Sequence, residues 1–389
     1  MLTKSESKQR VIRLQQHLQN ANIDGALIIF AIDIYYFTGT RQNSLLWVPA
    51  VGIPVLLVRK SLSRARSESM VEDVRPFPSS KELPLLFDDT IRKVGMTFDV
   101  VPVAQYNFYQ RALPGREFVD ISAINREIRS VKSAWELDRM KESGTNLCEI
   151  YRQVPEFLKA GMREIDLSAE FERRLRQAGN EGYVRMRGFN QEFFLGLALS
   201  SVTAGDPGFI DAPVTGRGLS SAAPYGASRC EIPINTPIFI DYVGVCEGYI
   251  VDMTRVFCIG SLSDELLHAF STSLAIQQYL TENLKPGAVC EQLFAQTLRM
   301  AEAAGLGSNY MGAPGENAKF VGHGIGLELD EFPVIAQGFK TQLQPGQTIA
   351  LEPKFVIPGH GVIGIENTFA VSEQGGIKLT DIPDAIIYC

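Results

Sequence analysis

The sequence predicts two domains: an α/β domain over residues 1–128 and an α+β domain over residues 129–389 that is built from two similar halves. The chain has 389 residues, which is more than one compact core usually holds. Residues 1–128 alternate between helical and strand patterns, as α/β domains do. In residues 129–389, two helices followed by strands occur twice. Two half-domains related by a pseudo-twofold axis, with a shared site between them, are therefore expected.

The first domain begins with an amphipathic helix over residues 4–20, whose apolar face carries Val11, Leu14 and Leu18. Strands are predicted at residues 25–30 and 51–58. The stretch DIYYFTGT at residues 33–40 follows the first strand, where α/β chains place functional loops.

In the second domain, helices are predicted at residues 135–159, 164–177, 263–283 and 288–304. A passage rich in Gly, Pro and Ser covers residues 205–228. It is long for an unstructured connection, and such loops often bind ligands or act as lids.

Composition excludes several classes of protein. Apolar residues make up 45% and charged residues 21% of the chain, as in soluble globular proteins. A net charge of −7 makes nucleic acid an unexpected partner, and the apolar runs are too short to cross a membrane. The N-terminus lacks the apolar core of a signal peptide, and the six cysteines form no CxxC pair. A cytoplasmic protein with reduced thiols is expected.

The main chemical signal lies in a predicted hairpin at residues 236–258, where each strand carries one acid, Asp241 or Asp252. If the turn is centred between Cys246 and Glu247, the two acids are direct cross-strand partners, roughly 5 Å apart. Two ionised carboxylates at that distance need a shared proton or a cation. The pair therefore predicts a metal site.

A second pair of acids has the same arrangement. Glu352 and Glu366 are symmetric about Gly359, in a predicted turn, so they should also face each other across a hairpin. His323, between glycines in VGHGIG, is either a satisfied core histidine or the nitrogen ligand of the same site. Four carboxylates and one imidazole suit manganese, iron(II), cobalt or zinc. They also suit two ions roughly 3.5–4 Å apart rather than one.

The order of these motifs, Asp, Asp eleven residues later, HGIG, Glu-Pro and I-E-N, resembles the pita-bread superfamily of metallopeptidases. DIYYFTG resembles the N-terminal domain of its X-Pro dipeptidase, X-Pro aminopeptidase and creatinase branch. The resemblance implies a pita-bread catalytic domain, frequent homodimers and a dinuclear site bridged by Asp252 and Glu366. The ligands that it implies are Asp241, Asp252, His323, Glu352 and Glu366.

Three positions depart from the pattern of that branch. Tyr225 and Asp330 stand where histidines are usual, and Gly364 stands where an arginine is common. As hypotheses, Tyr225 donates a hydrogen bond to the reaction intermediate, and Asp330 binds a cationic group of the substrate. Lys354 follows Glu352-Pro353 and is either a cation close to the site or a solvent-facing strand residue.

The predicted function is that of a dinuclear-metal hydrolase of the X-Pro dipeptidase or aminopeptidase type. It would cleave short peptides through a metal-bridging hydroxide, with Glu352 as the general base. Manganese is the expected metal. One alternative keeps the metals and acts on a small non-peptide amide or amidine, and another is a binding module without catalysis. The expected partners are a small substrate and a second copy of the chain.

Overall fold

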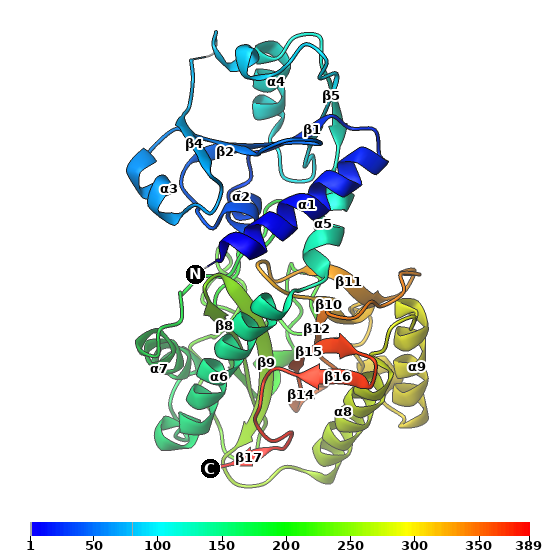
Figure 1. Ribbon diagram of the computed structural model, residues 1–389. Coiled ribbons are helices and arrows are strands. Elements are labelled where there is room, and N and C mark those ends of the chain that lie inside the picture. Colours follow the sequence, from blue (N-terminus) through cyan, green and yellow to red (C-terminus); the bar gives the residue numbers. More distant parts are fainter. Residues whose placement is uncertain (1, 80) are drawn as a thin grey trace. The chain divides into compact units, whose positions relative to one another are not determined.

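The computed structural model describes residues 2–79 and 81–389, apart from the side chains of residues 201 and 202. These residues divide into two compact units (Figure 1). One unit comprises Met1–Arg129 together with Arg187–Gln191, and the other comprises Ser130–Met186 and Glu192–Cys389. The division after Arg129 lies one residue from the boundary that the sequence predicted, whereas no pattern in the sequence indicated that residues 187–191 belong with the first unit.

The N-terminal unit is a sheet with helices on both faces. The strand order is β4-β3-β2-β1-β5-β6. The apolar face of α1 is buried at Val11, Leu14 and Leu18, as predicted. Helix α4 contributes Tyr109 to an apolar cluster with Trp47 of β2. The bounds are α1 Lys4–Asn20, β1 Gly25–Ile28, α2 Ala31–Thr38, β2 Ser44–Pro49, β3 Val55–Val58, α3 Leu62–Glu68, β4 Asp73–Pro76, β5 Lys93–Met96, α4 Val103–Ala112, β6 Glu117–Asp120 and α5 Ser122–Ser130.

The stretch DIYYFTGT is not the functional loop that the sequence predicted, because most of it forms helix α2. The carboxylate of Asp33 is fully buried and accepts hydrogen bonds from Arg129 at 2.7 Å and Arg187 at 3.4 Å. The helix ends at Gly39, which has a left-handed backbone (φ 83°). Asp33 therefore pairs with two arginines inside the N-terminal unit.

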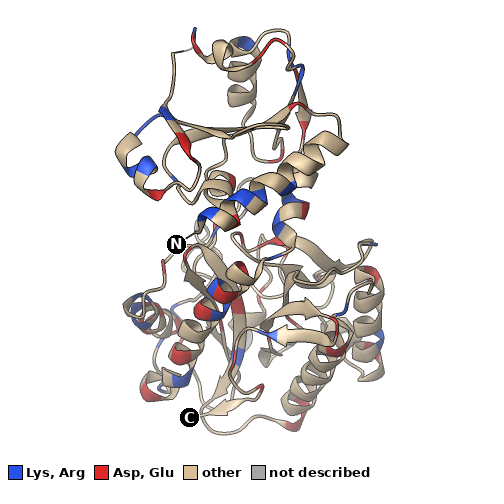
Figure 2. Cartoon of the chain, viewed as in Figure 1, with Lys and Arg blue, Asp and Glu red and all other residues tan. Residues whose placement is uncertain are grey.

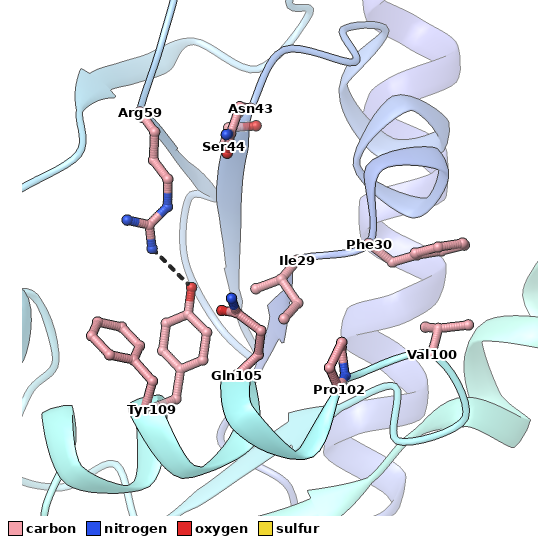
Figure 3. A pocket seen from close by; sticks show the side chains of 10 residues that line it. Ile29, Phe30, Asn43, Ser44, Arg59, Val100, Pro102, Gln105 and Tyr109 are labelled. Atoms are coloured by element: carbon pink, nitrogen blue, oxygen red, sulfur yellow. Dashed lines mark hydrogen bonds between the residues drawn. The ribbon is translucent and has the colours of Figure 1, made fainter. Parts of the chain in front are cut away.

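The N-terminal unit also contains a hollow of about 680 Å³ between the sheet and α4 (Figure 3). Arg59 reaches toward it and donates a hydrogen bond to the Tyr109 hydroxyl at 3.3 Å. The same guanidinium lies 3.5 Å from the centroid of the Phe77 ring. The charge of Arg59 is thus held between two aromatic side chains.

The C-terminal unit contains two sheets and a short ladder. One sheet has the order β17-β9-β8-β7, the other has the order β11-β10-β12-β15-β16, and β13 pairs with β14. The bounds are β7 Gly196–Ser200, β8 Ile238–Cys246, β9 Tyr249–Cys258, β10 Phe320–Gly324, β11 Glu331–Ala336, β12 Thr348–Leu351, β13 Lys354–Ile357, β14 Gly361–Gly364, β15 Asn367–Ser372, β16 Gly375–Lys378 and β17 Ile387–Tyr388.

Each sheet carries a pair of helices, as the repeated pattern of the sequence predicted. Helices α6 (Ala134–Phe157) and α7 (Glu164–Gln177) pack on the first sheet, and α8 (Asp264–Asn283) and α9 (Cys290–Ala303) pack on the second. Ser133 and Glu136 form a capping box at the start of α6. Acidic and basic residues are interspersed along α6 and α7 (Figure 2).

A backbone bridge between Thr254 of β9 and Glu366 links the two sheets. The amide of each residue donates to the carbonyl of the other, at 3.3 and 3.4 Å. The Thr254 hydroxyl also donates to Glu366 Oε2 at 3.0 Å. The meeting line of the two halves therefore passes through a predicted metal ligand.

The long loop at residues 205–228 is fixed at both ends by one buried carboxylate. Glu164, the first residue of α7, accepts hydrogen bonds from the amides of Ser200 and Ser228 at 2.7 and 2.9 Å. It also accepts from the Thr203 hydroxyl at 3.0 Å. The loop itself lines a hollow of about 290 Å³ together with residues 313–317. None of the helices over residues 2–79 and 81–389 has the length and apolarity needed to cross a membrane.

Candidate metal centre

The first pair of acids lies on one face of the β8–β9 hairpin, but the two residues are not direct cross-strand partners. Asp241 pairs with Thr254, and Asp252 pairs with Val243. The predicted register is wrong because the turn is centred between Glu247 and Gly248, whose φ angles are 46° and 83°. Two successive positive φ angles define the tight turn that matches strand twist. The acids are therefore diagonal neighbours on the same face.

The second pair of acids has the predicted symmetry. Lys354 pairs with Gly364 on one side of the pair, and Leu351 pairs with Asn367 on the other. Glu352 and Glu366 lie between these pairs at matching positions, so the two strands are symmetric about Gly359. Both side chains are buried.

His323 directs one ring nitrogen at these glutamates. Its Nδ1 lies 3.0 Å from the carbonyl of Leu329, and because a carbonyl only accepts, we assign the proton to Nδ1. Nε2 then carries a lone pair and lies 3.7 Å from Glu352 Oε1 and 3.9 Å from Glu366 Oε1. These distances are too long for hydrogen bonds, but they suit atoms that bind one ion at roughly 2.0–2.2 Å each.

Two further observations fit a divalent ion beside His323. Ligand atoms of Asp252, His323 and Glu366 lie within 4.8 Å of one another, and all three residues are buried. Over the described residues, Glu366 Oε1 has no hydrogen-bond partner, although it is buried. Because a buried carboxylate oxygen normally has a partner, this oxygen suits a metal ligand.

A lysine occupies the other side of the acid cluster. The Lys354 ammonium donates to Asp241 Oδ2 at 2.9 Å, to Glu352 Oε2 at 2.8 Å and to Glu366 Oε2 at 2.8 Å. Its side chain is 3% exposed, so it is not the solvent-facing residue that the sequence left open. The residues present therefore fit one ion beside His323, and they do not fit the predicted second ion beside Asp241.

The pKa values of the cluster show that its negative charge is only partly compensated. Burial raises the pKa of Asp252 well above its usual range, and the carboxylates of Glu366 and Asp241 add to this effect. Burial raises the pKa of Glu366 to about 7, although Lys354 opposes the shift. A carboxylate with a raised pKa is stabilised by an added cation. The side of the cluster next to His323 is thus electrostatically suited to a divalent ion.

The three departures from the family pattern lie around this cluster. Tyr225 is partly buried, and its ring packs against Phe193 and Phe194 at centroid distances of 5.3 and 6.1 Å. Asp330 is 52% exposed, and its Oδ1 lies 3.5 Å from His323 Nδ1. Gly364 is the cross-strand partner of Lys354.

Two family models match the chain, one in each part. The model "Metallopeptidase family M24" matches residues 138–373, and the model "Creatinase/Prolidase N-terminal domain" matches residues 10–131. The first match covers more than half of the chain. The pita-bread resemblance and the predicted combination of an α/β N-terminal domain with an α+β catalytic domain are confirmed.

Similar proteins extend over almost the whole chain. The Xaa-Pro dipeptidase of Pyrococcus furiosus is 26% identical over 377 residues, covering 96% of this chain and 98% of that protein. The uncharacterized peptidase YqhT of Bacillus subtilis is 24% identical over 381 residues, with 96% and 98% coverage. The structure of an Xaa-Pro dipeptidase from Bacillus anthracis has a TM-score of 0.85 at 22% identity, and the match covers 98% of this chain and 100% of that one.

Proposed function

Because this chain belongs to metallopeptidase family M24, a family of metal-dependent hydrolases, we propose that it hydrolyses short peptides of the X-Pro type. The observation that carries the proposal is the convergence of Asp252, His323 and Glu366 in one buried cluster. Asp241 and Glu352 belong to the same cluster, because both accept hydrogen bonds from the Lys354 ammonium. Two relatives that are similar over almost their whole length are named Xaa-Pro dipeptidases.

A divalent ion held by Asp252, His323, Glu352 and Glu366 would activate a water molecule and polarise the scissile carbonyl. Glu352 is the proposed general base. Its Oε2 accepts a hydrogen bond from Lys354, whereas its Oε1 faces His323, on the side where the ion and the activated water would lie. Glu352 would take the proton of the attacking water and pass it to the leaving amine. Manganese as the metal, a homodimer and a cytoplasmic location stay predictions.

Tyr225 is the proposed donor to the oxyanion that forms during hydrolysis. Burial, followed by the charges of Asp241 and Asp252, raises the pKa of Tyr225 well above its usual range, so its hydroxyl keeps its proton. Replacing Tyr225 with Phe should lower kcat by about 100-fold and leave KM within a few-fold, as loss of one oxyanion donor does. Steady-state kinetics on the best dipeptide would measure both. An unchanged kcat would remove Tyr225 from the mechanism.

Asp330 is the proposed contact for a cationic group of the substrate, because its carboxylate is half exposed beside His323. Asp330→Asn should therefore raise the KM for substrates with a free amine and leave the KM for N-acylated analogues unchanged. Equal effects on both substrate types would assign Asp330 to orienting His323 instead.

The test of the function itself uses the full chain, stripped of metal and then reloaded with Mn²⁺. Hydrolysis of Xaa-Pro dipeptides should exceed hydrolysis of dipeptides without proline, and a chelator should abolish it. A second candidate, hydrolysis of a small non-peptide amide or amidine, is favoured by the lysine inside the cluster and by Tyr225. Turnover of small amides or amidines in the absence of any dipeptide turnover would replace the first proposal with the second.

A further inference from the structure

We propose that Lys354 is a built-in substitute for one of two metal ions, so that this chain binds a single divalent ion, beside His323. The Lys354 ammonium lies at hydrogen-bond distance from three of the five predicted ligands, Asp241, Glu352 and Glu366. It occupies the place where an ion shared by these carboxylates would lie. The inference concerns metal content and holds whether or not the substrate is a peptide.

The cluster is divided cleanly between the two cations. Glu352 directs Oε2 at Lys354 and Oε1 at His323, and Glu366 does the same. An ammonium has three N–H donors and, unlike a metal ion, cannot coordinate a water molecule or a carbonyl oxygen as a Lewis acid. All three donors are used by the carboxylates, so Lys354 has none left for a substrate. Its role is therefore to hold charge and position the carboxylates, and the single ion must supply any Lewis acidity.

The sequence provides the space for this lysine on the opposite strand. Lys354 pairs with Gly364, and a Cβ at Gly364 would lie only 3.0 Å from Lys354 Cγ and 2.8 Å from its Cα. The same Cβ would lie 2.7 Å from the carbonyl oxygen of Pro353, so any side chain at position 364 would crowd the backbone of Pro353 and Lys354 as well as the stem of the lysine. The ammonium also lies 5.4 Å from the centroid of the Phe239 ring. These contacts enclose Lys354 on the strand side and favour its inward position.

Repulsion between like charges also disfavours a second ion. The second ion would also bind the carboxylate oxygens that already accept from Lys354, and so it would lie within a few ångströms of a like charge.

The test measures metal content and metal spacing rather than activity. The full-length protein is stripped, reloaded with Mn²⁺ and dialysed; elemental analysis then gives the ions per chain, and electron paramagnetic resonance reports whether neighbouring ions are coupled. Wild type should bind about one ion and give the spectrum of an isolated Mn²⁺. Lys354→Gly should bind about two ions per chain and show the broadened spectrum of a coupled pair.

A matched control removes another lysine, Lys378, which is only partly buried. Lys378 donates to Asp384 at 2.6 Å, and Lys378→Met should leave the content at about one ion, since neither residue belongs to the cluster. If Lys354→Gly does not fold, Lys354→Ala opens the same space. Wild type that binds no Mn²⁺, or about two coupled ions, would overturn the proposal, as would a content that stays at about one ion in Lys354→Gly. Failure to cleave dipeptides would count only against the proposed function.

Discussion

Replacing His323 with alanine is expected to lower the affinity for Mn²⁺ by at least about 100-fold, because loss of a ligand exceeds the usual cost of losing an outer partner. The Nε2 atom of His323 faces the oxygens of Glu352 and Glu366 that Lys354 does not use. Without it, the single ion would depend on carboxylates alone. Titration calorimetry with Mn²⁺ measures the affinity, and hydrolysis of the best substrate should fall in parallel.

His360 provides the matched control for this change. It lies in the turn after β13, is about half exposed and pairs with Glu265 at 3.6 Å. His360→Ala should leave both Mn²⁺ affinity and turnover within about twofold, since substitutions away from a site rarely exceed about 0.5 kcal/mol. An unchanged Mn²⁺ affinity in His323→Ala would mean that the ion binds elsewhere.

Replacing Arg255 with methionine is expected to lower the free energy of unfolding of the C-terminal unit by about 3–5 kcal/mol, the usual cost of breaking a buried ion pair. Arg255 is fully buried in β9. Its guanidinium donates to the carbonyl of Glu366 at 3.0 Å, to Asn367 Oδ1 at 2.8 Å and to Asp384 Oδ1 at 2.9 Å. Methionine keeps the apolar stem but removes all of these hydrogen bonds at once, so the loss exceeds that of one hydrogen bond.

The two tryptophans allow this measurement to follow one unit. Trp47 belongs to the N-terminal unit and Trp135 to the C-terminal unit. In a Trp47→Phe background, fluorescence during urea unfolding reports Trp135 alone. The control is Arg217→Met, which removes an exposed arginine paired with Asp206 and should change stability by no more than about 0.5 kcal/mol. A loss below about 1 kcal/mol for Arg255→Met would show that solvent replaces its partners.

Local patterns predicted much of this fold, while register and side-chain direction needed the tertiary structure. The helices at α1, α6, α7, α8 and α9 follow from apolar periodicity and from caps such as Ser133. The turn centred on Gly359 could be located because Pro358, Gly359 and Gly361 are residues typical of turns. The β8–β9 turn was misplaced by one residue because the sequence around Cys246 does not show which residues take positive φ.

The role of Lys354 shows a different limit of sequence reasoning. Its spacing of two residues from Glu352 was visible, and such spacing places side chains on one face of an extended chain. Whether that face is buried depends on Gly364, the partner of Lys354 on β14, and on Phe239 of β8 in another sheet. The side-chain environment of Lys354 is therefore set by residues distant in sequence, and no local pattern reports it.

The meeting of Thr254 and Glu366 has a consequence for how the protein acquires its chemistry. These residues are 112 positions apart, and the hydrogen bonds between them bring the two hairpins together. Contacts between distant segments form slowly, because the intervening chain loses freedom before the contact is made. During synthesis, the acids of the first hairpin would leave the ribosome long before Glu352, Lys354 and Glu366. The ability to hold a metal is therefore expected to appear as one of the last events of folding.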